Sequence, residues 1–103
     1  MTEFKKGDYV YIKKIGSYSE EISYISILES YDEEKHIASE IASVWAEDTL
    51  PDECEEMMYY HSATGNIVEI RLATEKEESY IEDCMYDDGI KFDKETMELI
   101  KLY

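Results

Sequence analysis

The chain has 103 residues, a mass of 12.1 kDa and a formal net charge of −16, with 26 acids against ten Lys and Arg. This length suits one small domain with one core, and the 44% share of hydrophobic residues argues against a disordered acidic tail. A polyanion is repelled by nucleic acid and by anionic lipid, so we expect direct binding to neither nucleic acid nor membrane.

Cysteine usage and the N-terminus point to a reducing compartment. Cys54 and Cys84 are too few for a disulfide scaffold, and they do not form a CxxC pair. The N-terminal residues lack the apolar run of a signal peptide, and no stretch of the sequence is apolar enough for a membrane span. We therefore expect a cytoplasmic protein.

The first predicted strand begins after Gly7 and Asp8. Val10 and Ile12 alternate with Tyr9, Tyr11 and Lys13, and this period of two predicts a half-buried strand. The opening resembles the first strand of small Src-homology-type barrels, a resemblance that bears on the fold and not on function. A run rich in Ile, Tyr and Ser over residues 22–28 predicts a second strand.

Residues 32–45 fit two structures. As a helix, Asp32 is the N-cap, and Ile37, Ile41 and Val44 fall on one apolar stripe with Trp45. As a strand, residues 32–35 form a hairpin turn and alternate residues share a face. The cap and the stripe favour the helix, and the strand stays open as an alternative.

The second half of the chain predicts a hairpin followed by two helices. Strands over 57–61 and 67–73 flank a turn at 63–66. Thr74 and Glu77 have the spacing of a capping box, which predicts a helix over 75–86, and Asp93 is expected to cap a terminal helix over 94–102. The predicted fold class is α+β, a small antiparallel sheet or partly open barrel with two or three helices.

No motif in the sequence predicts catalysis or a bound cofactor. A calcium loop aligned on Gly89 puts Cys84 and Tyr86 where carboxylates are needed, and the Cys and His residues lack the short paired spacing of a zinc site. We therefore expect no metal, no cofactor and no catalytic residue. An enzyme would require a concave pocket that holds His36 or His61.

The strongest feature is an acidic stretch over residues 47–88. It has 14 acids against two bases, a local charge of −12. Duplex DNA has one charge per about 1.7 Å of axis, so the charge of this small chain approaches that of a short duplex. A solvated surface that only keeps the protein soluble is the plainer interpretation of the same residues.

Two segments, EDTLPDECEE at 47–56 and EKEESYIEDCMYDD at 75–88, are similar in composition to the small acidic DNA-mimic inhibitors that bacteriophages direct against host nucleic-acid proteins. The resemblance implies a partner: the basic DNA-binding groove or channel of a host sliding clamp, nuclease, CRISPR or restriction effector, or polymerase. It also implies residence in the host cytoplasm, and a homodimer is compatible with it. A non-inhibitory acidic adaptor or structural protein is the alternative.

The residues expected to contact this partner are carboxylates that supply charge and tyrosines that supply apolar contact. They are Glu53, Glu55, Glu56, Tyr59, Glu75, Glu78, Tyr80, Glu82, Asp83, Tyr86, Asp87 and Asp88.

Overall fold

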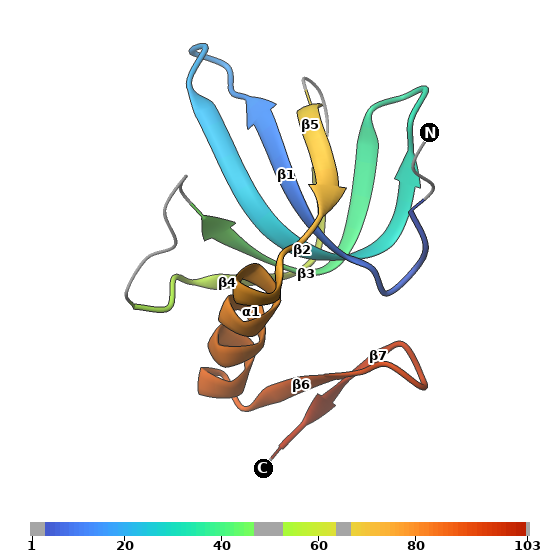
Figure 1. The fold of residues 1–103 in the computed structure, drawn as a ribbon, viewed down its shortest axis with the longest axis vertical. Coiled ribbons are helices and arrows are strands. Elements are labelled where there is room, and N and C mark those ends of the chain that lie inside the picture. Colours follow the sequence, from blue (N-terminus) through green and yellow to red (C-terminus); the bar gives the residue numbers. More distant parts are fainter. Residues whose placement is uncertain (1–3, 47–52, 64–66, 103) are drawn as a thin grey trace.

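The computed structural model describes residues 4–46, 53–63 and 67–102, which form a small α+β domain (Figure 1). Five antiparallel strands make one sheet in the order β4-β3-β2-β1-β5. Their bounds are β1 Tyr9–Ile15, β2 Glu21–Asp32, β3 Ile37–Ala46, β4 Met57–Ala63 and β5 Ile67–Leu72. Helix α1 (Glu75–Asp87) follows, and β6 (Ile90–Asp93) and β7 (Glu98–Lys101) form a separate hairpin.

The main sheet is strongly bent, and its bends coincide with breaks in strand register. The β2–β3 register shifts on both sides of Leu28, and the β1–β5 register shifts between Lys13 and Lys14. A bulge adds an unpaired residue that bends its strand and increases its twist. The long strands β2 and β3 therefore curve through the molecule (Figure 1).

Both faces of the bent sheet are buried. On one face Tyr9, Ile25 and Val44 pack in a core cluster with Ile81 and Met85 of α1. On the opposite face a second cluster holds Val10, Ile12, Leu28 and Ala38. The first strand is confirmed, but it is buried on both sides rather than half-buried, because α1 covers one face and the curved sheet folds over the other.

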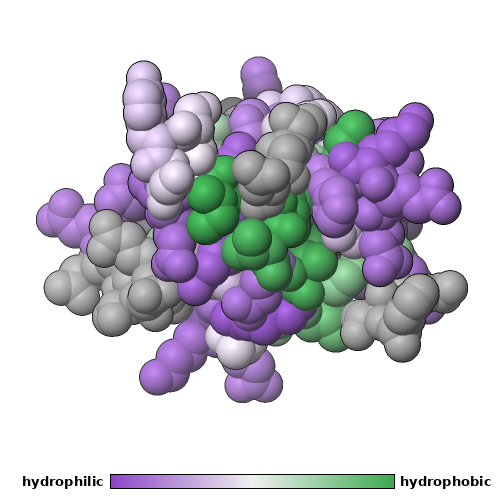
Figure 2. Space-filling view, turned by 90° about the horizontal axis from the view of Figure 1, so that it is seen from above, coloured by the Kyte–Doolittle hydropathy of each residue, from purple (hydrophilic) through white to green (hydrophobic). Residues whose placement is uncertain are grey.

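An end-on view shows where hydrophobic residues reach the surface. Seen from the end of the sheet where β1 stops and β5 starts, they gather at the centre and hydrophilic residues surround them (Figure 2). Helix α1 lies at the opposite end of the molecule (Figure 1).

The predicted capping box begins α1. The Thr74 hydroxyl accepts a hydrogen bond from the Glu77 backbone N–H (3.2 Å), and the Glu77 carboxylate accepts one from the Thr74 N–H (2.8 Å). The helix ends at Asp87, and its C-cap Asp88 is followed by Gly89 (φ +73°). In the described part of the chain, no helix combines the length and apolar character needed to cross a membrane.

The helix favoured for residues 32–45 is wrong, since Ile37–Ala46 form strand β3. Asp32 does act as a cap, but its carboxylate accepts the Lys35 N–H (3.1 Å) in a tight turn. His36, at φ +54°, turns the chain so that Ile37 pairs with Asp32. The same side-chain hydrogen bond begins helices and turns, and pairing along the whole of β2 decides between them here.

The hairpin predicted from strands over 57–61 and 67–73 is wrong, although both strands form. Strand β4 pairs with β3 and strand β5 pairs with β1, so the two lie at opposite edges of the sheet. Pairing with these longer strands, and not the turn between β4 and β5, decides their positions.

The predicted terminal helix is also absent, so the described chain has one helix and not two or three. Asp93 accepts hydrogen bonds from the backbone N–H groups of Glu95 (2.8 Å) and Thr96 (3.4 Å), as a cap does. Met97, at φ +59°, then reverses the chain into β7. The turn lets the segment pair with β6, which buries Phe92 against the first core.

The capping box gives a direct test of the helix start. We expect Thr74→Ala to lower the free energy of unfolding by about 1 kcal/mol, because it leaves the Glu77 N–H without its acceptor. Ser79→Ala, at an exposed position of the same helix, should cause no loss because Ala is the better helix former. Urea unfolding followed by circular dichroism measures both; equal losses would contradict the role given to Thr74.

Candidate functional site

The negative charge is concentrated in the second half of the described chain. Between residues 53 and 88 there are 11 acids and two bases, whereas residues 4–46 have eight acids and five bases. The C-terminal hairpin, residues 90–102, is balanced at three of each. Whether these acids form one surface depends on how the chain places them in space.

Two acidic segments that are distant in sequence lie side by side. The Glu55 N–H donates to the Tyr80 hydroxyl of α1 (3.3 Å), and the Tyr59 hydroxyl donates to the Asp88 carboxylate (2.7 Å). These contacts hold residues 53–59 along the C-terminal half of the helix. We call the acids that they bring together the acidic surface: Glu53, Glu55, Glu56, Asp83, Asp87 and Asp88, all exposed.

Part of the acidic surface lies at the C-terminal end of α1, where carboxylates are unfavourable. The C-terminal end of a helix has a partial negative charge, so acids there are unfavourable by roughly 0.3–1 kcal/mol each. Asp83 and Asp87 lie in this part of α1, Asp88 is its C-cap, and the last turn contains no basic residue. The chain therefore keeps these acids at a cost in stability.

The other predicted contact residues occupy mixed positions. Tyr80 is only 8% exposed and belongs to the core, whereas Tyr86 is 67% exposed. Tyr59 is half-buried, and loss of solvation followed by its hydrogen bond to Asp88 raises the pKa of its hydroxyl. Among the three tyrosines, only Tyr86 is therefore presented openly to a partner.

The remaining three predicted acids lie on α1 but outside the acidic surface. Glu75 is exposed in the first turn and Glu78 is half-buried. The Glu82 carboxylate accepts a hydrogen bond from the Tyr9 hydroxyl (3.4 Å), and burial followed by the charge of Glu82 raises the pKa of Tyr9. Glu82 therefore connects the helix to β1.

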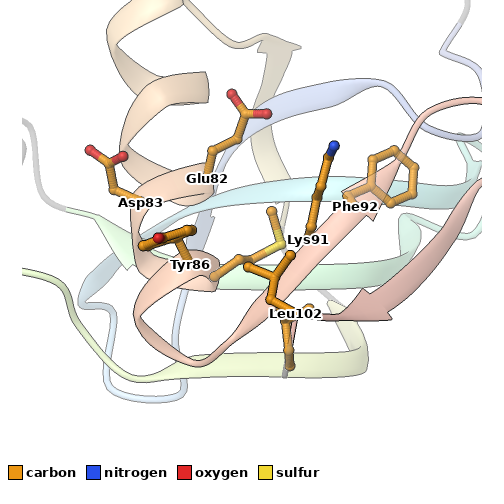
Figure 3. A pocket seen from close by; sticks show the side chains of 8 residues that line it. Glu82, Asp83, Tyr86, Lys91, Phe92 and Leu102 are labelled. Atoms are coloured by element: carbon orange, nitrogen blue, oxygen red, sulfur yellow. The ribbon is translucent and has the colours of Figure 1, made fainter.

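A pocket of about 270 Å³ is lined on one side by α1 and on the other by the C-terminal hairpin. Figure 3 shows the helix residues Glu82, Asp83 and Tyr86 on one side and Lys91, Phe92 and Leu102 on the other. Because Lys91 and the apolar hairpin residues form half of the wall, this pocket is less acidic than the surface beside residues 53–56.

Another cavity, of about 360 Å³, is lined by Trp45, Met58, Glu55 and Glu56. The Trp45 side chain is 53% exposed, and its ring meets the edge of Tyr24 at 5.8 Å and 79°. The sequence analysis missed this residue, because the helix favoured there placed Trp45 on a buried stripe. Its being the only Trp was the one available signal.

A buried polar cluster lies on the same face of the sheet as Trp45. The Glu40 carboxylate accepts a hydrogen bond from the Ser26 hydroxyl (2.6 Å), and its other oxygen lies 3.6 Å from His61 Nδ1. That oxygen, His61 Nδ1 and Ser43 Oγ have no hydrogen-bond partner among the described residues. Burial raises the pKa of Glu40, and the Ser26 hydrogen bond opposes the shift.

Sequence reasoning could not have found this cluster. Glu40 is one of 26 acids, and it turns inward only because the bulge beside Leu28 pairs it with Leu28 on the buried face. His61 lies opposite Glu40 in β4, whereas His36 is exposed in the turn before β3.

The described residues offer little for metal or thiol chemistry. Within residues 4–46, 53–63 and 67–102, no group of three or more His, Cys, Asp or Glu is placed to hold a metal ion. Loss of solvation, followed by the neighbouring Cys84 and Asp87, raises the pKa of Cys54 to about 12. At neutral pH Cys54 is therefore a thiol and a weak nucleophile.

Compared with family models, curated proteins and solved structures, the chain shows no significant similarity to any of them.

The buried carboxyl predicts an unusual pH dependence. The pKa of Glu40 is raised in the folded state. The contribution of Glu40 to the free energy of unfolding is therefore fully present below the pKa that it has in the unfolded chain, and it is lost as the pH rises through the pKa that it has in the folded state. We expect Glu40→Gln to raise the free energy of unfolding at pH 7 by about 1 kcal/mol, with no gain at pH 4. Glu34→Gln, at an exposed position, is the control. The free energy of unfolding is measured with denaturant at both pH values, and a destabilising effect of Glu40→Gln at pH 7 would contradict the prediction.

The acids at the end of α1 predict a stabilising substitution. Asp83→Asn together with Asp87→Asn should raise the free energy of unfolding by about 1 kcal/mol at low ionic strength, because both charges oppose the helix dipole. The matched pair Glu33→Gln and Glu34→Gln removes the same charge from an exposed turn. Urea titrations at low and high salt would contradict the prediction if both pairs changed stability equally.

Proposed function

We propose that the protein is a DNA-mimic inhibitor that binds the basic DNA-binding groove or channel of a host protein and blocks access of nucleic acid. The observation that carries the proposal is the contact of residues 53–59 with α1, which joins two acidic segments into one surface. A partner that binds this surface would replace phosphate contacts by carboxylate contacts to its Lys and Arg residues.

The charge of the surface supports steering and recognition. Between residues 53 and 88 the excess is nine negative charges, and only Arg71 and Lys76 are basic there. Of these, Arg71 is already bound to Glu77 at 2.8 and 3.1 Å. The exposed carboxylates would speed association with a basic protein at low salt, and the exposed ring of Tyr86 would add a desolvated contact.

The fold supports the proposal as a rigid scaffold. We also propose that the bent sheet is a partly open barrel, because β5 returns to pair with β1 while β4 and β5 remain at the two edges. Such a barrel would hold α1 in place through the first core.

The alternative is a non-inhibitory adaptor or structural protein whose charge serves solubility. The acids at the C-terminal end of α1 favour the inhibitor over this alternative. Acids that only keep a protein soluble can lie anywhere on its surface, so solubility does not explain why these lie where the helix dipole disfavours them. The two functions differ in their response to salt and to competing DNA.

A charge-reversal experiment tests the proposal. Glu53→Lys, Asp83→Lys and Asp87→Lys together reverse three exposed acids of the acidic surface. The matched control, Glu29→Lys, Glu33→Lys and Glu34→Lys, makes the same change in net charge on exposed residues at the end of β2 and in the turn that follows. Each variant and the parent protein serve as bait in a bacterial lysate.

We expect the parent and the control to recover one DNA-binding protein that is released by high salt and displaced by duplex DNA, and the surface variant to recover at least tenfold less. Quantitative mass spectrometry measures recovery, and circular dichroism confirms that both variants fold. Equal loss in the two variants, or a partner that duplex DNA does not displace, would sink the proposal.

A further inference from the structure

We propose that the cavity lined by Trp45, Met58, Glu55 and Glu56 is a receptor for one arginine side chain of the basic partner. The inference rests on the proposed function, because it names the group that such a partner inserts. It assigns a specific binding role to Trp45, which charge alone does not predict.

The cavity provides an aromatic ring beside two carboxylates that form no ion pair with a described residue. The 5.8 Å edge contact with Tyr24 fixes the Trp45 ring while 53% of the residue remains exposed. Glu55 and Glu56 are exposed, and neither makes an ion pair with a described residue. A volume of about 360 Å³ admits a long basic side chain.

The molecule already contains a guanidinium held by the same chemistry. Arg71 lies over the ring of Tyr11, 4.2 Å from its centroid, and donates two hydrogen bonds to Glu77. A second carboxylate, Glu69, lies 3.4 Å from Arg71 Nε. Arg71 is held by one aromatic ring, two carboxylates and the Leu72 carbonyl oxygen (3.2 Å). The Trp45 cavity repeats the ring and the two carboxylates, and its lining contains no cation among the described residues.

A buried polar atom lies behind the cavity. Ser43 is directly opposite Met58 in the β3–β4 ladder, and it is two residues from Trp45 on the same strand. Its hydroxyl is fully buried and has no hydrogen-bond partner among the described residues. The hydroxyl does not line the cavity and lies close enough to the Glu40 carboxylate to lower the pKa of that group, so the site rests on the Trp45 ring and the two carboxylates.

Arginine fits better than lysine at this position. Its planar group stacks on an indole ring while its N–H groups point outward to carboxylates, so the two kinds of contact form together. An ammonium group is a compact, strongly hydrated charge and gains less from the ring. Nucleic acid and anionic lipid would be repelled by Glu55 and Glu56.

The single tryptophan of the chain makes the test direct, since its fluorescence reports on this cavity alone. The probe is the capped tripeptide Gly-Arg-Gly, and the matched probe is Gly-citrulline-Gly, which has the same shape without the charge. We expect a saturable change in Trp45 emission with the arginine peptide, with a dissociation constant on the order of 1 mM, and at least tenfold weaker binding of the citrulline peptide. Equal responses to the two peptides would overturn the inference.

Matched variants separate a specific site from general charge. Glu55→Gln with Glu56→Gln should weaken arginine-peptide binding about tenfold, whereas Glu33→Gln with Glu34→Gln, which removes the same charge elsewhere, should leave it within twofold. Both pairs lie at exposed positions, so folding is retained, and circular dichroism checks this. Equal weakening by both pairs would overturn the site.

Recovery of the partner distinguishes this inference from the proposed function. Trp45→Ala should lower recovery of the DNA-displaceable partner about tenfold, whereas Tyr18→Ala, at an aromatic residue 93% exposed in another part of the chain, should not. If Trp45→Ala recovers the partner fully, the inference fails and the proposed function stands. If no partner is recovered by any variant but the arginine peptide binds, the cavity is confirmed as an arginine site and the proposed function fails.

Discussion

The first turn of α1 is attached to the sheet by the bidentate contact between Arg71 and Glu77, and the acidic surface lies farther along the same helix. Arg71 extends from β5, lies over Tyr11 of β1 and donates to the Glu77 carboxylate, which also closes the capping box at Thr74. Burial disfavours the Glu77 charge, but Arg71 and the Thr74 hydrogen bonds outweigh it, and the pKa of Glu77 is lowered. One carboxylate therefore fixes both where the helix begins and how it meets the sheet.

Acidic residues lie at both ends of α1, where the helix dipole has opposite effects on them. At the N-terminal end Thr74 and Glu77 satisfy free backbone N–H groups and place negative charge where the helix dipole favours it. At the C-terminal end Asp87 and Asp88 place the same charge where the dipole disfavours it, beside the exposed acids of residues 53–56. A helix stabilised at one end can tolerate such acids at the other, which connects the fold of this element to the binding role proposed for it.

On the face of the sheet away from α1, a row of polar groups runs along β3 toward the surface. The fully buried Glu40 is bound on one oxygen by Ser26 and approached on the other by His61. Beyond them, Ser43 and Trp45 continue along β3 to the cavity at Met58. Of these groups, the Trp45 ring lines the proposed arginine receptor and adds to it what charge lacks, because an exposed acidic patch alone would offer only solvent-screened attraction.

The sequence by itself determined the elements whose signals are local. The alternation at Val10 and Ile12 predicted β1, and the spacing of Thr74 and Glu77 predicted the start of α1, because each signal lies within a few residues. The excess of acids over residues 47–88 likewise predicted where charge would collect.

Only the tertiary structure decided the elements whose signals are ambiguous. Asp32 and Asp93 form hydrogen bonds that begin either a helix or a turn, and pairing with β2 and β6 selected the turn in both cases. The register shift at Leu28 turned Glu40 inward, and the contacts of Tyr59 and Tyr80 brought the two acidic segments together. These outcomes depend on strand register and on packing between distant segments, and neither is encoded in a local pattern.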